Sequence, residues 1–150
     1  MKSETVITIA SGYFNPVHVG HIELFNNAKS ISDLLIVIVN NDKQRELKGS
    51  KKFLNENDRV EIIKNIKSVD FVELSIDQDR SVVRTIEKLY LKYNKSGEIK
   101  FIFVNGGDQF SESVAERNIC KKLGIFMMDG LGDKIRSSSE IIRNSEEELN

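Results

Sequence analysis

Two histidines lie three residues apart in the segment SGYFNPVHVGH (residues 11–21), which holds every histidine and proline of this 150-residue chain. If a helix starts here, His18 and His21 fall on the same side of its first turn. Two imidazoles beside a helix N-terminus favour an anion, and Gly20 between them leaves room for a bulky one. The segment therefore predicts a cradle for a polyphosphate, whose charge would favour the imidazolium form of the rings.

Two plainer interpretations of the histidine pair stand beside this one. The pair could bind a metal, although no cysteine or further histidine stands nearby as a third ligand. It could also do no more than cap a helix. The position of the pair directly after an apolar run and a Ser-Gly turn favours the phosphate cradle.

The residues before the histidines suit such a site. The first strand is expected to end at Ala10, and Ser11 and Gly12 then turn the chain away from it. Gly12 has no Cβ, so the backbone could approach a ligand closely there. Pro16 presets a dihedral angle suited to helix entry, which predicts a helix beginning near residues 17–18.

Short apolar runs alternate with amphipathic stretches along the chain. Five runs are the expected strands, at residues 5–10, 34–40, 71–74, 100–104 and 125–128. Five helical stripes accompany them: Leu24, Ala28 and Ile31; Val60, Ile63 and Ile66, capped by Asn55 or Asn57; Val82, Ile86, Leu89 and Tyr93; Val114, Ile119 and Leu123, ending at Gly124; and Ser138, Ile141 and Ile142. The alternation predicts an α/β fold, a Rossmann-like open parallel five-stranded sheet with helices on both faces, in a single domain over residues 1–150. Ligands of such sheets bind at the carboxyl ends of the strands.

The stretch after the second strand is rich in cations, namely Lys43, Arg45, Lys48, Lys51 and Lys52. Gly49 and Ser50 predict that this stretch is a mobile loop. A run of this kind is usually a solvated surface. Beside a triphosphate, however, flexible cations supply the charge stabilisation that phosphoryl chemistry needs.

Two further segments follow expected strands or open expected helices. Gly106, Gly107 and Asp108 come after the fourth strand, where the glycines permit close approach of a base or ribose, or form an ordinary turn. Ser137, Ser138 and Ser139 open the last helix, where three hydroxyl groups and unpaired backbone N–H groups predict a second anion site.

Composition excludes several classes of partner. The net charge of −1 and the isoelectric point near 6.2 give no basic field for nucleic acid. The longest apolar runs are too short to cross a bilayer, and the first residues lack the pattern of a signal peptide. The single cysteine, Cys120, is expected to pack inside a helix and suggests a reducing, cytoplasmic compartment.

The sequence His18-Val19-Gly20-His21 resembles the HxGH signature of the nucleotidyltransferase superfamily related to class I aminoacyl-tRNA synthetases. Five further segments follow in the order seen in glycerol-3-phosphate cytidylyltransferases and heptose-phosphate adenylyltransferases, so the resemblance covers nearly the whole chain: residues 39–49, 58–63, 67–72, 104–108 and 135–143. It implies the same Rossmann-like fold and transfer of a nucleotidyl group.

The resemblance also implies roles for individual residues. His18, His21 and Lys48 would be catalytic, and Asp42 and Arg59 would hold the acceptor, although Arg59 could instead pair with Glu56 or Asp58. Nucleotide binding would fall to Ser11, Gly12, Tyr13, Phe14, Gly20, the 106–108 loop and the three serines at 137–139. Two positions depart from the cytidylyltransferase pattern. Asn15 replaces its usual aspartate, as in nicotinate-mononucleotide adenylyltransferases, and Gly132 replaces an arginine.

The reaction predicted from these residues needs no built general base. A phosphate oxygen of the acceptor, already ionised, would attack the α-phosphorus of a nucleoside triphosphate and release pyrophosphate. We expect Mg²⁺ to be held mainly by the triphosphate, with no protein metal site. CTP is the preferred donor and ATP the alternative, with a phosphorylated alcohol or sugar as acceptor. The resemblance also implies a homodimer, formed through the region that matches residues 67–72. A nucleotide-binding regulator without turnover is the rival class of function.

Overall fold

The computed structural model describes residues 4–95, 98–105 and 113–129. Five strands form one sheet: β1 (Thr5–Gly12), β2 (Leu34–Val39), β3 (Phe71–Leu74), β4 (Ile99–Asn105) and β5 (Phe126–Asp129). Five helices accompany them: α1 (Val19–Ser30), α2 (Asp42–Lys48), α3 (Glu56–Lys64), α4 (Val83–Tyr93) and α5 (Ser113–Leu123). The predicted open, Rossmann-like parallel sheet is confirmed.

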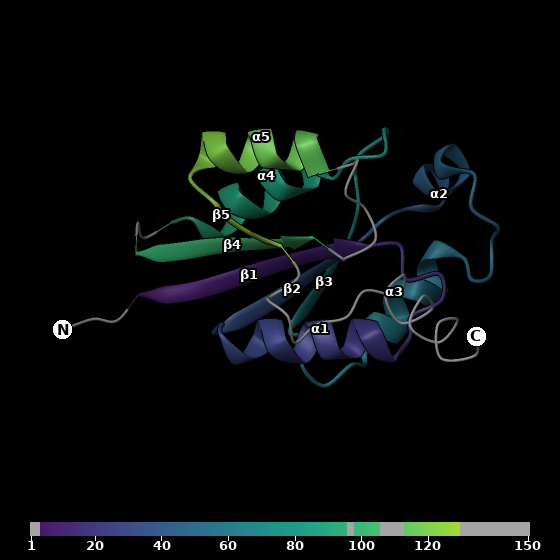
Figure 1. Cartoon of the computed structure of the whole chain (residues 1–150), viewed down its shortest axis with the longest axis horizontal. Coiled ribbons are helices and arrows are strands. Elements are labelled where there is room, and N and C mark those ends of the chain that lie inside the picture. Colours follow the sequence, from purple (N-terminus) through teal and green to yellow (C-terminus); the bar gives the residue numbers. More distant parts are fainter. Residues whose placement is uncertain (1–3, 96–97, 106–112, 130–150) are drawn as a thin grey trace, which may run out of the picture.

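The strands lie in the order β3-β2-β1-β4-β5, and every neighbouring pair is parallel (Figure 1). Strand β1 is central, with β2 on one side and β4 on the other. The chain therefore reverses its direction of travel across the sheet at β1. Such a switch point leaves a crevice beyond the carboxyl ends of the strands, which is where β1 delivers residues 13–18.

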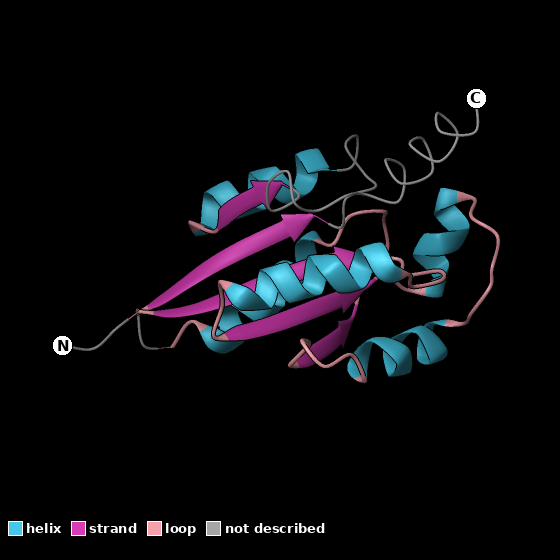
Figure 2. Ribbon diagram, turned by 60° about the horizontal axis from the view of Figure 1, so that its bottom comes forward, coloured by secondary structure: helices cyan, strands magenta, loops and turns pink. Residues whose placement is uncertain are grey.

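Helices cover both faces of the sheet, as expected. Helices α1 and α3 lie on one face and α4 and α5 on the other (Figure 1), and Figure 2 shows α1 lying across the strands. Strand β2 explains why both faces are covered, because Leu35 and Val37 pack in one apolar cluster and Ile36 and Ile38 in the other. Its near-continuous apolar sequence is typical of a strand buried on both sides.

Several local expectations are confirmed. Asn55 caps α3 by accepting a hydrogen bond from the backbone of Asp58. Gly124 follows α5 in the left-handed region with φ +74°, as a helix-ending glycine should. Cys120 is buried in the core, where desolvation, followed by the nearby Glu116, raises its pKa to about 12. This thiol is therefore a packing residue.

Other local expectations are wrong. Ser11 pairs with Ile38 and Asn105, so residues 11 and 12 continue β1 rather than forming a turn. Helix α1 starts later than expected, because His18 is its N-cap and Pro16 lies before the helix. Ile31 and Val114 were expected in the buried apolar stripes but are exposed to solvent, and 58% of the surface of Val114 is accessible. The expected helix from Ser138 lies outside the described residues.

Gly12 leaves space for a side chain of the protein itself. A Cβ placed on Gly12 would lie 2.8 Å from Cζ of Phe14. Phe14 is buried and has φ +52°, which turns its ring back over the end of β1. The absence of a Cβ at Gly12 therefore allows the ring of Phe14 to approach the backbone closely. Separately, no helix in the described ranges is long and apolar enough to cross a membrane.

We expect Gly12→Ala to lower the free energy of unfolding by about 1–3 kcal/mol, because the added methyl group overpacks the site against the Phe14 ring. Denaturant unfolding measures the change. In a Phe14→Leu background, which removes the clashing ring atoms, the same substitution should cost clearly less. A cost that does not depend on residue 14 would contradict this explanation.

Candidate active site

A cavity of about 400 Å³ opens beyond the carboxyl end of β1. Three segments build its walls: the loop between β1 and α1, the first turn of α1, and the end of α2 with the residues that follow it. The residues that line it are Tyr13, Phe14, Asn15, Pro16, His18, His21, Lys48, Ser50, Lys51 and Phe53. The three residues predicted to be catalytic therefore share one cavity, although they come from different helices.

The two imidazole rings are stacked, with centroids 3.8 Å apart and planes inclined by 29°. Both rings take part in capping α1. His18 Nδ1 accepts a hydrogen bond from the backbone N–H of Gly20, and His21 Nδ1 accepts one from the backbone N–H of His18. Gly20 thus contributes a backbone donor to this capping box. Both histidines therefore cap α1 and also line the cavity, and binding of a polyphosphate by the pair stays a prediction.

Capping fixes where each ring carries its proton. Because both Nδ1 atoms accept hydrogen bonds, the neutral form of each ring carries its proton on Nε2. Burial, followed by the charge of His18, lowers the pKa of His21 to about 4. The ring of His21 is 7% exposed and lies edge-on to Phe14 at 5.0 Å between centroids. Without a ligand His21 is therefore a neutral N–H donor at pH 7, and the imidazolium expected beside a bound polyphosphate stays a prediction.

Lys48 brings a positive charge to the opposite side of the cavity. It is the last residue of α2, and its Nζ lies 4.4 Å from the centroid of the Tyr13 ring. A cation over an aromatic face is attracted by the quadrupole of the ring. Tyr13, expected to bind nucleotide, therefore lies in the cavity in contact with the predicted catalytic lysine.

A mobile loop was expected for the cationic stretch, but residues 42–48 form helix α2. Arg45 is buried, and its Nη1 donates to the carbonyl of Ser50 at 2.6 Å. Lys43 and Lys52 are exposed and do not line the cavity, whereas Lys51 does. The stretch therefore divides into two lysines at the cavity, one structural arginine and two surface lysines.

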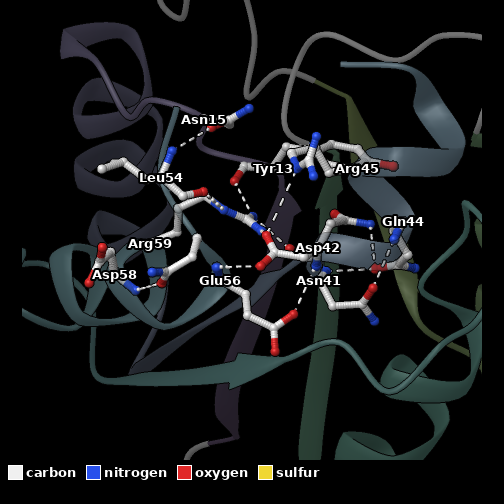
Figure 3. A network of polar contacts seen from close by, with 12 residues as sticks. Tyr13, Asn15, Asn41, Asp42, Gln44, Arg45, Leu54, Glu56, Asp58 and Arg59 are labelled. Carbon is white, nitrogen blue, oxygen red and sulfur yellow. Dashed lines mark hydrogen bonds and ion pairs between the residues drawn. The ribbon is translucent and has the colours of Figure 1, made fainter. Parts of the chain in front are cut away.

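Arg59 differs most from its expected role. Its side chain is fully buried and donates four hydrogen bonds, to the carbonyl oxygens of Leu54, Tyr13 and Asn40 and to Oδ1 of Asp42 at 2.7 Å (Figure 3). The salt bridge considered with Glu56 or Asp58 is replaced by this one with Asp42. With these donors committed inside the protein, Arg59 positions the site rather than facing an acceptor.

Asp42 is likewise engaged by neighbouring residues. Its Oδ2 accepts the backbone N–H of Glu56, and Glu56 Oε1 accepts the backbone N–H of Asp42, so each helix N-terminus receives a carboxylate from the other (Figure 3). Burial acts to raise the pKa of Asp42, but the Glu56 backbone hydrogen bond and Arg59 outweigh it and lower the pKa below its usual value. Asp42 is therefore ionised and connects α2 to α3 through its contacts with Glu56 and Arg59.

Three polar residues of this region were not predicted. Asn41 caps α2 in a capping box with Gln44, and Gln44 also donates to the carbonyls of Asp79 and Ser81. Asn15, noted only as a departure from the aspartate pattern, contacts three residues of the segment after α2. An Asn-x-x-Gln pair is a sequence signature of a helix start, so the beginning of α2 could have been predicted from Asn41 and Gln44.

Some predicted residues are not brought to the cavity. Ser11 is buried inside β1, and Gly12 faces the Phe14 ring. The predicted nucleotide-binding residues Gly106, Gly107 and Asp108 and the three serines at 137–139 lie outside the described residues. Within the described ranges, no group of three or more histidine, cysteine, aspartate or glutamate side chains could hold a metal ion.

A pocket with two histidines and a lysine at the switch point of a Rossmann-like sheet is where such a fold binds its ligands. Residues 9–144 match the family described as cytidylyltransferase-like, and the chain belongs to that family. The family expected from the sequence is thereby confirmed.

Individual relatives agree with this assignment. The bifunctional protein HldE of Citrifermentans bemidjiense is 32% identical over 143 residues, which cover 91% of this chain but 26% of the relative, so the chain spans about a quarter of that protein. A probable nicotinate-nucleotide adenylyltransferase of Pelagibacter ubique is 26% identical, with 95% of this chain and 81% of the relative covered. The structure of the lipopolysaccharide core biosynthesis protein from Thermoplasma volcanium matches with a TM-score of 0.62 at 25% identity, covering 83% of this chain and 93% of the other.

We expect proton NMR to show one histidine titrating near pH 4, because burial disfavours the charged form of His21. The chain has two histidines, so a His18→Asn variant assigns the signals. The unfolded ring takes up its proton near pH 6.5 and the folded ring near 4, so the free energy of unfolding should fall across this window as the pH falls, by up to about 3 kcal/mol. Titration of both rings near pH 6.5 would contradict the neutral assignment.

We expect Arg59→Lys to lower the free energy of unfolding by about 3 kcal/mol or more. The lysine keeps the charge but cannot reach all the backbone carbonyls and Asp42, and unsatisfied buried groups are costly. The exposed Arg84→Lys is the matched control and should change stability by less than about 0.5 kcal/mol in the same denaturant titration. Equal effects of the two substitutions would show that the Arg59 contacts contribute little.

Proposed function

We propose that this protein transfers a nucleoside monophosphate from a nucleoside triphosphate to a phosphorylated small alcohol or sugar and releases pyrophosphate. The observation that carries the proposal is the meeting of His18, His21 and Lys48 in one cavity at the switch point of the sheet. A neutral imidazole donor, a helix N-terminus and an ammonium group together suit a polyphosphate. The membership of the cytidylyltransferase-like family supports the same class of reaction.

The proposed step balances without a general base. An ionised oxygen of the acceptor phosphate forms a bond with the α-phosphorus, and the bond from that phosphorus to the bridging oxygen breaks. Negative charge then passes to the departing pyrophosphate, and no proton has to move. The Nε2–H group of His21 orients phosphate oxygens, while Lys48 stabilises the charge that develops as pyrophosphate leaves. Each well-placed donor can contribute about 3 kcal/mol to such a step.

We propose that Mg²⁺ enters with the triphosphate, and that phosphate oxygens supply most of its ligands. Asp42, the carboxylate beside the cavity, has its oxygens on Arg59 and on the backbone of Glu56. When bound, the ion would neutralise charge on the phosphates.

CTP is the donor we propose, and ATP is the second candidate. ATP is favoured by the relative whose name describes adenylyl transfer to nicotinate nucleotide, and by Asn15, which matches that group in the histidine segment. Pyrophosphate release from CTP, ATP, GTP and UTP, each with a panel of phosphorylated polyols, sugars and nucleotides, tests the proposal. Release that needs one triphosphate and one acceptor supports it. Tight binding of a triphosphate with no release in any pair would favour the regulator instead.

We expect Lys48→Ala to lower turnover at least about a hundredfold while the affinity for triphosphate falls by less, because the charge it stabilises develops in the transition state. Lys43→Ala is the matched control, since Lys43 is an exposed lysine of the same helix that does not line the cavity. Steady-state pyrophosphate release and calorimetric binding give the two quantities. A loss confined to affinity would exclude the transition-state role of Lys48.

A further inference from the structure

Residues 50–54 form one wall of the cavity but belong to no helix or strand. Ser50, Lys51 and Phe53 line the cavity from this wall. Phe53 is 65% exposed, so packing of its ring in the core does not hold the wall in place. The position of the wall must therefore depend on polar contacts.

Asn15, in the loop that leads to the histidines, makes three of these contacts. Its Nδ2 donates to the carbonyl oxygen of Lys51 at 2.8 Å. Its Oδ1 accepts the backbone N–H groups of Phe53 and Leu54 at 3.1 and 3.2 Å, the latter drawn in Figure 3. One side chain thus holds the middle of the wall through both ends of its amide.

The two ends of the wall are held differently. Arg45 donates to the carbonyl of Ser50, and Arg59 donates to the carbonyl of Leu54. Both arginines come from α2 and α3, the helices that flank the wall. Asn15 alone among these three comes from the segment that carries the histidines. Arg59 joins that segment to the end of the wall, through the carbonyls of Tyr13 and Leu54, and Asn15 joins it to the middle of the wall, between the histidine side and the lysine side of the cavity.

The chemistry of these contacts requires an amide. A carboxylate at position 15 could still accept the two N–H groups, but it could not donate to the Lys51 carbonyl and would face that oxygen with a negative charge. Asn15, which replaces the aspartate of the cytidylyltransferase pattern, is therefore the residue that suits the contacts with the 50–54 wall.

We propose that Asn15 is a positioning residue that couples the histidine loop to the 50–54 wall and so sets the width of the cavity for a polyphosphate. The inference rests on the proposed function, because the polyphosphate concerned is the tail of the donor nucleotide. It does not give Asn15 a role in bond making or breaking.

Amide hydrogen exchange, followed by NMR on the protein without ligand, tests the coupling. In Asn15→Ala, exchange at Phe53 and Leu54 should become at least about tenfold faster, because both N–H groups lose their acceptor. In Asn15→Asp, which folds with the two acceptor contacts kept, exchange at these amides should stay slow. The exposed Asn26→Ala and Asn26→Asp are matched controls on α1 and should leave it unchanged. Unchanged exchange in Asn15→Ala would overturn the proposal.

Binding of inorganic tripolyphosphate, measured by calorimetry, tests the consequence. Both Asn15 variants should raise its Kd at least about tenfold, and in turnover they should raise KM for the triphosphate with kcat within about threefold. Faster exchange with unchanged tripolyphosphate affinity would overturn the positioning role. Absence of turnover in the unaltered protein would overturn the proposed function instead, while exchange and tripolyphosphate binding would still decide the role of Asn15.

Discussion

The guanidinium group of Arg59 connects three backbone carbonyls and one carboxylate at the carboxyl edge of the sheet. It binds the carbonyl of Tyr13 after β1, that of Asn40 after β2, that of Leu54 in the cavity wall, and the carboxylate of Asp42 at the start of α2. A fully buried charge is tolerated only when it is paired and its donors are satisfied. Because moving any one segment would leave this charge uncompensated, Arg59 fixes the positions of all of them together.

These contacts of Arg59 help to set the shape of the cavity. Tyr13, whose carbonyl Arg59 binds, carries the ring beneath Lys48. The same loop continues through Asn15 to His18 at the N-terminus of α1. The residues proposed to contact a ligand and the residues that position them therefore form one connected set, in which Arg59 is the most deeply buried.

The sequence allowed the strands to be placed within two residues, because burial on both faces produces continuous apolar runs. Helix α2 was missed because its seven residues, DKQRELK, carry no apolar stripe, although the pair Asn41 and Gln44 signals its start. The partners of Arg59 could not be predicted in the same way. They lie 17, 19 and 46 residues away, and no local spacing encodes a contact that only the assembled sheet edge brings together.

The histidine pair shows how burial and helix capping limit what an imidazole ring can do in the cavity. The Nδ1 atoms of both rings are used to cap α1, so adding a proton there would break a hydrogen bond of the helix start. With His21 neutral, the lysines supply cationic charge through flexible ammonium groups that can shift with a moving charge. A fixed imidazolium would bind the triphosphate before reaction as strongly as during it, whereas a mobile lysine can bind more strongly as pyrophosphate departs. Only that difference accelerates a reaction, and on this ground a neutral His21 with mobile lysines suits the proposed nucleotidyl transfer better than a fixed charge at that position.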